Sequence, residues 1–302
     1  MAGKVEQIIT DRILAQLRNG VIPWRRPWWT AGAPRNYDTN RNYSGINFFL
    51  LSMLGHADPR FITGRAAAKK HGWAPIKGKS IPIVFYKKLE SKTKVDRNGN
   101  PATYMMLRYY NVWNIADVDD SNSDTKIEPM ADAPNCEFTE IERCEQVLSS
   151  MPNCPPINHD GSRACYSPSS DIVTMPPRNR FEEPSEYYST LFHELGHSTG
   201  HKSRCNRNMD CKQLGNYARE ELIAEMIACF VCGHCGIESK TIGNTSAYIA
   251  TWLECLGNDP KLVLTAGSKA QKGANYILDV ADPYVKTKTQ TQTETDKVLT
   301  PA

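Results

Sequence analysis

Long hydrophobic runs are missing from this chain: no apolar stretch reaches roughly 18 residues, the length that indicates a membrane-spanning helix. The first twenty residues also lack the apolar block and the small-residue cleavage site of a signal peptide. Their apolar residues recur instead at the spacing of an amphipathic helix. We therefore expect a cytoplasmic protein with no membrane partner.

Cysteine is absent from the first 135 residues, and all ten cysteines follow them. Without a secretory signal, a disulfide scaffold is not expected. The segment Cys229-Phe-Val-Cys232-Gly-His-Cys235 contains C-G-H-C, the motif of disulfide isomerases, but that motif belongs at the start of a helix and here it ends one. We interpret these cysteines as small core residues. A redox site and a second zinc site are the alternatives.

Acidic residues are scarce in the first part of the chain. Residues 1–118 carry 19 Lys and Arg against 7 Asp and Glu, a net charge of +12, whereas the remainder carries 17 against 26, a net charge of −9. A basic half that also contains many aromatic side chains indicates a polyanionic partner. The division of charge predicts two domains with separate functions.

Large apolar residues are few in two segments. Residues 116–135, where the charge changes sign, have the composition of a linker, and the Thr/Gln/Lys-rich end has that of a disordered tail. We therefore predict a basic domain over 1–118, an acidic linker over 119–135, a second domain over 136–284 and a disordered tail over 285–302.

The predicted fold class is α+β, with a small sheet in the first domain and mainly helices in the second. "SIPIVFYKKL" and "YMMLRYYNVWNI" are strand-like and flank the turn "DRNGN". One helix is expected from about Ile46 and another between Thr63, as its cap, and Gly72. In the second domain a short strand, "DIVTMPP", precedes a helix that Ser185 caps and Gly200 ends, and three further helices follow.

The first of these helices contains His193-Glu194-Leu195-Gly196-His197, the pattern H-E-x-x-H. Residues four apart share a helix face, so both imidazoles can bind one Zn²⁺ while Glu194 activates the water beside it. The pattern also occurs by chance, and a plain surface helix is the alternative. The capped amphipathic helix, the strand before it and the Glu-rich helix after it favour a metal site.

A tetrahedral zinc site needs a third protein ligand. In gluzincin-type metallopeptidases a second helix brings a glutamate to the metal, and an acidic residue four positions later orients a ligand histidine. The matching pair here is Glu221 as ligand and Glu225 as its orienting neighbour, with the reverse left open. Glu220 points about 100° away around the helix and is expected to be solvated.

Three further features allow two interpretations each. His201 is a rival ligand, although Gly200 is expected to end the helix before it, and a role in the turn is the other interpretation. Tyr217 could donate a proton to a developing oxyanion or simply belong to the core. "DIVTMPP" fits the edge strand with which zincins hold an extended peptide, or it is purely structural.

The basic half mixes cations with aromatic rings, beginning with "PWRRPWW". Single-stranded nucleic acid is held by such a mixture, because cations track phosphates and rings stack under unpaired bases, with roughly 1–3 kcal/mol per base. The alternative is that the tryptophans are core and the charges a solvated surface. The predicted DNA-binding residues are Trp24, Arg25, Arg26, Trp28, Trp29, Arg35, Tyr37, Arg41, Tyr43, Lys69, Lys70 and Trp73.

Together, "PWRRPW", "NYSGIN", "FITGRAAAKKHGW", "YYSTLFHELGHSTGH" and "YAREELIAEM" resemble the ArdC-type antirestriction proteins of conjugative plasmids, which are similar to the N-terminal part of some plasmid primases. The likeness covers about residues 4–282. It implies a single-stranded-DNA-binding domain followed by a zincin-like metallopeptidase domain, and protection of incoming DNA from restriction enzymes in a bacterial cytoplasm. His193, Glu194 and His197 match the family motif directly, and Glu221 falls in the family's cluster of glutamates. The cysteines and the Thr/Gln tail depart from the family.

These observations predict an antirestriction protein in which His193, His197 and Glu221 bind Zn²⁺, with Mn²⁺ or Co²⁺ as alternative metals, and Glu194 activates water for attack on a peptide carbonyl. The expected partners are single-stranded DNA and a protein substrate or restriction enzyme. One alternative is a non-catalytic protein that shields single-stranded DNA and whose metal only stabilises the fold. Another is an accessory to a primase or relaxase.

Overall fold

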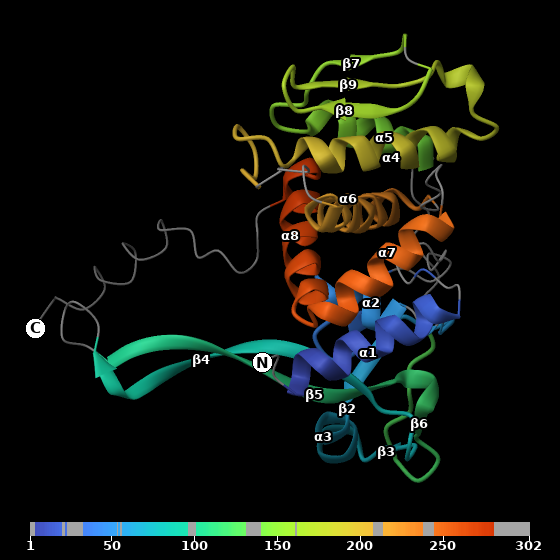
Figure 1. The fold of residues 1–302 in the computed structure, drawn as a ribbon. Helices are drawn as coiled ribbons and strands as arrows, with labels where there is room; N and C mark the ends of the chain where they lie inside the picture. Colours follow the sequence, from blue (N-terminus) through green and yellow to red (C-terminus); the bar gives the residue numbers. More distant parts are fainter. Residues whose placement is uncertain are drawn as a thin grey trace, which may run out of the picture.

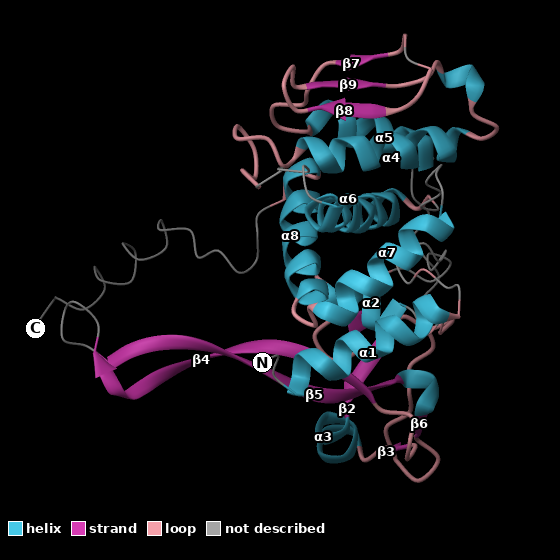
Figure 2. Cartoon of the chain, viewed as in Figure 1, coloured by secondary structure: helices cyan, strands magenta, loops and turns pink. Residues whose placement is uncertain are grey.

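The computed structural model describes residues 4–19, 22, 33–52, 54, 56–95, 101–130, 140–160, 162–207, 214–237 and 245–280. The predicted tail and the tryptophan-rich segment around residue 25 lie outside these residues. The fold is α+β in two domains, as predicted, with a sheet in the first domain and mainly helices in the second (Figure 2). No helix in the described part of the chain is long and apolar enough to span a membrane.

A four-stranded sheet of order β1-β2-β5-β4 organises the N-terminal domain. β1 (Arg35–Asn36) is parallel to β2 (Arg60–Thr63), which is antiparallel to β5 (Pro101–Asn114). β5 also pairs with β4 (Ile81–Val95), so the two predicted long strands are confirmed. They continue well beyond the rest of the sheet as a two-stranded arm that projects from the body (Figure 1).

Helices and helical turns complete this domain. The predicted helix at Ile46 and the predicted cap at Thr63 are confirmed: the Thr63 side chain accepts a hydrogen bond from the Ala66 N–H, and the turn ends at Gly72 with φ of 70°. The helices are α1 (Lys4–Arg18), α2 (Ile46–Ser52), α3 (Gly64–Ala66), the π-helical turn η1 (Ala67–His71) and the 3₁₀ turn η2 (Ile115–Asp117).

The first part of the acidic segment folds onto this domain. β6 (Val118–Asp119) pairs with β3 (Ala74–Pro75), and the indole N–H of buried Trp73 donates a hydrogen bond to the Thr125 carbonyl. Ile127 packs beside the same apolar cluster. Contrary to the prediction, residues 119–130 are therefore not a free linker, because their carbonyls and one apolar side chain complete the packing around Trp73.

The C-terminal domain stacks a small sheet on layers of helices (Figure 1). The sheet of order β7-β9-β8 lies over α4 and α5, and α6 lies below α5. The predicted helices and the short strand are confirmed. The elements are α4 (Glu140–Ser150), β7 (Ile157–Asn158), β8 (Cys165–Ser167), β9 (Ile172–Thr174), η3 (Arg178–Arg180), α5 (Pro184–Ser198), α6 (Leu214–Cys235), α7 (Thr245–Asn258) and α8 (Leu262–Ile277).

The two domains share one apolar core. Phe48 and Phe49 of α2 pack against Phe230 of α6, with ring centroids 4.9 and 4.8 Å apart. Buried residues of α1 belong to the same cluster as those of α5, α6 and α8. The Thr10 hydroxyl of α1 also donates a hydrogen bond to the Pro260 carbonyl between α7 and α8. The predicted basic and acidic domains are therefore packed against each other by their helices.

Candidate functional site

Helix α5 carries the H-E-x-x-H pattern. It begins at Pro184, which suits the first helical position because proline has no N–H to leave unpaired. Glu183 is the N-cap, so the predicted cap, Ser185, lies inside the first turn instead. The helix ends at Ser198, close to the predicted stop at Gly200. With these two ends, His193 and His197 lie in the last turns of α5.

One helical turn brings both imidazoles to the same point. The Nε2 atoms of His193 and His197 are 3.1 Å apart. Glu221 of α6 faces them, with its Oε2 3.4 Å from Nε2 of His193 and its Oε1 3.6 Å from Nε2 of His197. The ligand atoms of these three residues lie within 4.8 Å of one another.

These spacings fit a divalent metal ion. With metal–ligand bonds of about 2.0–2.2 Å, the corners of a tetrahedral site lie about 3.3–3.6 Å apart. Two imidazole nitrogens and a carboxylate form a donor set of the kind found at catalytic zinc. His193, His197 and Glu221 are therefore arranged as three ligands that could hold one ion, as the sequence predicted.

Close packing of α5 on α6 makes this meeting possible. Gly196 lies between the two histidines in sequence, and a Cβ atom there would be 3.2 Å from the Ala224 carbonyl oxygen and 3.3 Å from Cβ of Ile227. A side chain at this position would push the helices apart. The glycine in H-E-L-G-H therefore helps to bring the carboxylate of α6 within reach of the imidazoles.

Glu220 occupies the other side of His197. Its Oε1 lies 3.6 Å from Nδ1 of His197 and 2.5 Å from Nη2 of Arg207, while its Oε2 is 3.3 Å from Nε of Arg207. The prediction that Glu220 is solvated is wrong: it is only 4% exposed. Because α6 is enclosed on nearly all sides, a rotation of 100° turns a side chain toward another buried surface and not toward water.

The surroundings of the cluster shift two pKa values in opposite directions. Burial alone would lower the pKa of His197, but the carboxylates of Glu220 and Glu221 outweigh burial and raise that pKa to about 10. Burial alone would raise the pKa of Glu221, but contact with His193 and His197 lowers it well below its usual range. A positive charge at the centre of this cluster is therefore strongly favoured.

Glu194 lies beside the cluster. Its side chain is buried, and its charge contributes to raising the pKa of His197, which shows that the carboxylate is near that imidazole. Glu194 is not one of the three grouped residues. Its position therefore leaves it available as a base next to a metal ion held by the other three.

The two remaining candidates for metal binding stand apart. Glu225 is buried but does not join the cluster, and Nδ1 of His193 has no hydrogen-bond partner in the described part of the chain, so Glu225 does not orient it as predicted. His201 also lies outside the cluster: its Nδ1 is 2.7 Å from the Ser203 hydroxyl and 3.7 Å from Asp171. His201 therefore belongs to the turn after α5, which is one of the two interpretations of this residue.

Other expectations of the second domain are corrected or confirmed. Strand β9 is the central strand of its sheet, between β7 and β8, so it is not the edge strand that could pair with a peptide. Tyr217 is 40% exposed and is not core, while its role as a proton donor stays a prediction. The cysteines of α6, Cys229, Cys232 and Cys235, are buried in the core, as expected.

The predicted DNA-binding residues fall into three groups. Trp24, Arg25, Arg26, Trp28 and Trp29 lie outside the described residues. The aromatic residues that are described pack within the protein. Trp73 is 2% exposed and stacks on His71, Tyr37 packs edge-on against Trp73, and burial raises the pKa of Tyr43 to about 12. These three rings are therefore poor platforms for bases, and for Trp73 that prediction is wrong.

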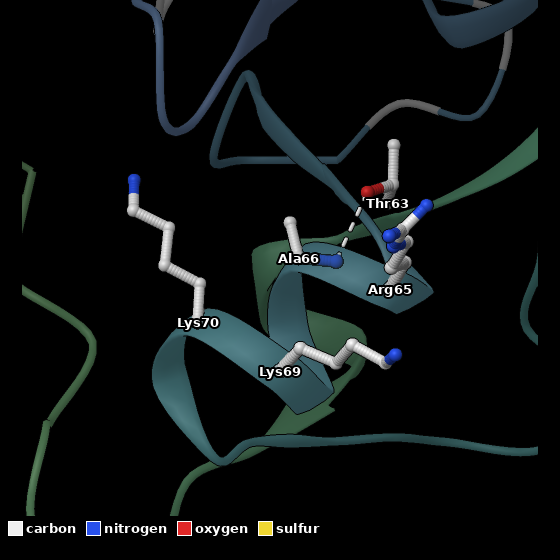
Figure 3. A pocket seen from close by; sticks show the side chains of 5 residues that line it. All are labelled: Thr63, Arg65, Ala66, Lys69 and Lys70. Carbon is white, nitrogen blue, oxygen red and sulfur yellow. Dashed lines mark hydrogen bonds between the residues drawn. The ribbon is translucent and has the colours of Figure 1, made fainter.

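The cations of this domain form the third group. Arg41 is exposed and Arg35 is half-buried. Lys69 and Lys70 join Arg65 in lining an open pocket of about 500 Å³ on the helical turn that Thr63 caps (Figure 3). Arg65, Lys69 and Lys70 are exposed, and their side chains point away from this turn (Figure 3). Lys70 pairs with Asp38 at 2.6 Å. Cations spaced in this way can contact phosphates.

The exposed aromatic residues of the β4–β5 arm are not among the predicted DNA-binding residues. Most of the large exposed aromatic side chains in the described structure lie there: Phe85, Tyr86, Tyr104, Tyr109 and Tyr110. The alternation of aromatic and basic residues in "FYKKL" and "YMMLRYY" was the available signal. A strand pattern alone does not indicate which of its residues the sheet leaves uncovered.

Two family models match the chain, one in each domain. Residues 3–113 match the N-terminal domain of anti-restriction factor ArdC, and residues 143–269 match a zincin-like metallopeptidase. The cluster described above lies within the second match. The N-terminal sheet and the basic pocket lie within the first.

Similar proteins include two DNA primases TraC from Escherichia coli, 31% and 30% identical over 90% and 93% of this chain. The chain spans only 20% and 28% of the length of those primases. The uncharacterized protein y4eC of Sinorhizobium fredii is 31% identical, and the match covers 89% of this chain and 90% of that protein.

Crystal structures of the antirestriction protein ArdC from plasmid R388 have a similar fold. The metal-free structure has a TM-score of 0.73 and the Mn(II)-bound structure one of 0.72, both at 29% identity. They cover 93% and 94% of this chain and the whole of that protein. With matches to both domains, in sequence and in structure, the chain belongs to the family of ArdC-type antirestriction proteins, and its C-terminal domain is zincin-like.

Proposed function

We propose that this chain protects incoming DNA from restriction by binding single-stranded DNA and hydrolysing a protein on it at a metal-dependent peptidase-type site. The observation that carries the proposal is the meeting of His193, His197 and Glu221 beside Glu194. A helix that had lost its metal site would not be expected to keep both ligands at this spacing and a buried base.

Zinc is the metal we propose, because two imidazoles and one carboxylate form a donor set of catalytic zinc. Mn²⁺ and Co²⁺ are alternatives, since similar ligands accept several divalent ions and the related ArdC structure holds Mn(II). When bound, such an ion would polarise a peptide carbonyl and lower the pKa of a water molecule at its open position. His193, His197 and Glu221 would hold it.

Glu194 would act as the general base. Its carboxylate takes a proton from the attacking water and then gives it to the nitrogen of the leaving amine, so that one residue serves both halves of the hydrolysis. Burial of Glu194 restricts bulk water around it, which strengthens its interaction with nearby charge. Glu220 and Arg207 would keep the His197 ring in place during this exchange.

Single-stranded DNA is the proposed partner of the N-terminal domain. Two observations support this DNA-binding role: the net charge of +12 over residues 1–118, and the cationic pocket of Arg65, Lys69 and Lys70. Because the two domains share a core, DNA bound to the first would hold the peptidase-type site close to proteins on that DNA. The protein substrate, or a restriction enzyme, is the second proposed partner. A bacterial cytoplasm is the setting that this function requires.

The test compares wild type, Glu194→Ala and Glu182→Ala for protection of unmodified DNA that enters a restricting host. Glu182 is an exposed residue just before α5 and serves as the matched control. Each variant is first shown to be folded and to bind single-stranded DNA. Loss of protection for Glu194→Ala alone would support hydrolysis. Full protection by Glu194→Ala would contradict it and favour a protein that shields DNA while its metal stabilises the fold.

A further inference from the structure

We propose that one face of the β4–β5 arm is the surface on which this chain stacks the bases of single-stranded DNA. This inference rests on the proposed single-stranded-DNA binding and identifies where it takes place. Strands β4 and β5 pair without interruption from Ile81 opposite Val112 to Glu90 opposite Thr103. The arm projects from the body, so its outer part is open to a long, flexible ligand (Figure 1).

The strand register separates the aromatic rings into two faces. Side chains alternate between the faces of a strand, and residues opposite each other lie on the same face. Phe85 pairs with Arg108, Ile83 with Tyr110 and Leu89 with Tyr104, so Phe85, Tyr104 and Tyr110 share one face, here called the stacking face. Tyr86 and Tyr109 lie on the opposite face.

The rings of the stacking face are accessible. Phe85, Tyr104 and Tyr110 are 40%, 48% and 39% exposed. Phe85 and Tyr110 contact each other edge to face, with centroids 5.5 Å apart, and this contact fixes their orientation. Tyr104 and Tyr110 are six residues apart along β5, a distance of about 20 Å. Such a length can contact several successive nucleotides.

Charge favours DNA on this face over the other. Lys87 and Arg108 are exposed on the stacking face between the rings. Over the paired residues 81–90 and 103–112, this face carries no carboxylate. The opposite face includes Glu90, and the charge of Glu6 acts on Tyr86. A polyanion is therefore attracted to one face of the arm more than to the other.

Unpaired bases are the ligand that this surface fits. Stacking requires the flat face of a base, which a duplex keeps within its own stack, whereas single strands expose it. Cations placed between rings match a strand whose phosphates alternate with bases. The other described aromatic residues of the basic domain that were candidates, Tyr37, Tyr43 and Trp73, are engaged in packing. The arm therefore supplies the exposed rings that those positions lack.

The experiment measures fluorescence anisotropy of a labelled oligothymidylate of about 20 nucleotides with the full chain. Phe85→Ala/Tyr104→Ala/Tyr110→Ala removes the stacking face, and Tyr86→Ala/Tyr109→Ala is the matched control from the opposite face. We expect the triple variant to bind at least about tenfold more weakly and the control within about twofold of wild type. Thermal unfolding checks that both variants are folded.

A second variant keeps the test decisive if the triple variant does not fold. Lys87→Gln/Arg108→Gln retains every ring, and we expect it to weaken binding and to reduce the salt dependence of the affinity. Wild-type affinity in the triple or the charge variant would overturn the inference while leaving single-stranded-DNA binding intact. Equal loss in the opposite-face control, or equal loss with duplex DNA, would also overturn it. If the wild type itself does not bind the oligonucleotide, the proposed DNA binding fails as well.

Discussion

The Oε1 atom of Glu220 lies 3.6 Å from Nδ1 of His197, while Nε2 of the same ring faces Glu221. A carboxylate therefore lies opposite each nitrogen of this imidazole, and Arg207 pairs with the carboxylate of Glu220. A histidine whose second nitrogen is fixed in this way presents its first nitrogen to a metal in a defined tautomer and orientation. This arrangement ties the loop after α5 to the candidate metal centre.

We expect Glu220→Gln to lower the affinity for Zn²⁺ by about 10- to 100-fold, because the amide cannot hold the His197 ring as the carboxylate does. Competition with a chelating dye at neutral pH measures this change. Glu254→Gln, an exposed position on α7, is the control and should bind as wild type does. An unchanged affinity in folded Glu220→Gln would show that the Glu220 contact does not support metal binding.

We expect Gly196→Ala to destabilise the protein by about 1–3 kcal/mol, since its methyl group would press on the Ala224 carbonyl. Separation of α5 and α6 should also weaken Zn²⁺ binding by moving Glu221 away from the histidines. Gly257→Ala on α7 is the matched control, because a Cβ atom there meets nothing within 4 Å and helix propensity improves. Urea denaturation measures the stability of both variants. Equal stability of the two variants would contradict the close-packing account.

We expect Phe48→Ala to cost about 3–5 kcal/mol and to lower the midpoint of one cooperative unfolding transition. Phe48 is buried and contacts Phe230, so its loss opens the core that the two domains share. Leu54→Ala, at a 40% exposed position just after α2, should change stability by less than about 0.5 kcal/mol. Calorimetry showing two transitions, only one of them shifted, would mean that the domains unfold independently.

Stability should depend on pH through Asp58. Burial alone would raise the pKa of Asp58, but hydrogen bonds and charge from Arg60 lower it below its ordinary value. A carboxyl with a lowered folded-state pKa stabilises the fold above its unfolded pKa of about 3.9, and this contribution is lost as pH falls through the folded value. We expect Asp58→Asn to be less stable than wild type at pH 7 and the difference to shrink below about pH 4. A difference that is constant with pH would contradict this.

The sequence predicted those features that depend on local pattern. The strands of the arm, the Thr63 cap and the helix that carries His193 and His197 follow from alternation, capping residues and helical spacing. The prediction of Glu221 as the third ligand followed from the gluzincin pattern, in which a second helix lies near the first. The strands, the cap and the helical spacing need no knowledge of how distant elements pack, whereas Glu221 was predicted from the gluzincin arrangement of two helices.

What the sequence could not predict depends on tertiary packing. Whether Glu220 faces water is decided by how fully α6 is enclosed, and the partner that neutralises it, Arg207, belongs to a loop with no recognisable pattern. Trp73 fits the sequence pattern of a platform for bases, but the acidic segment packs against it. The place of β9 at the centre of its sheet likewise depends on strands whose pairing no local signal reveals.

The most direct test of the central claim is the metal content of the purified protein. Apo protein is dialysed against Zn²⁺ and its metal measured by mass spectrometry, for wild type and for His193→Ala/His197→Ala, with both forms shown to be folded. The account predicts one ion per chain in the wild type and almost none in the double variant. Retention of one ion by the double variant, or its absence from the wild type, would contradict the assignment of His193, His197 and Glu221 as the metal centre.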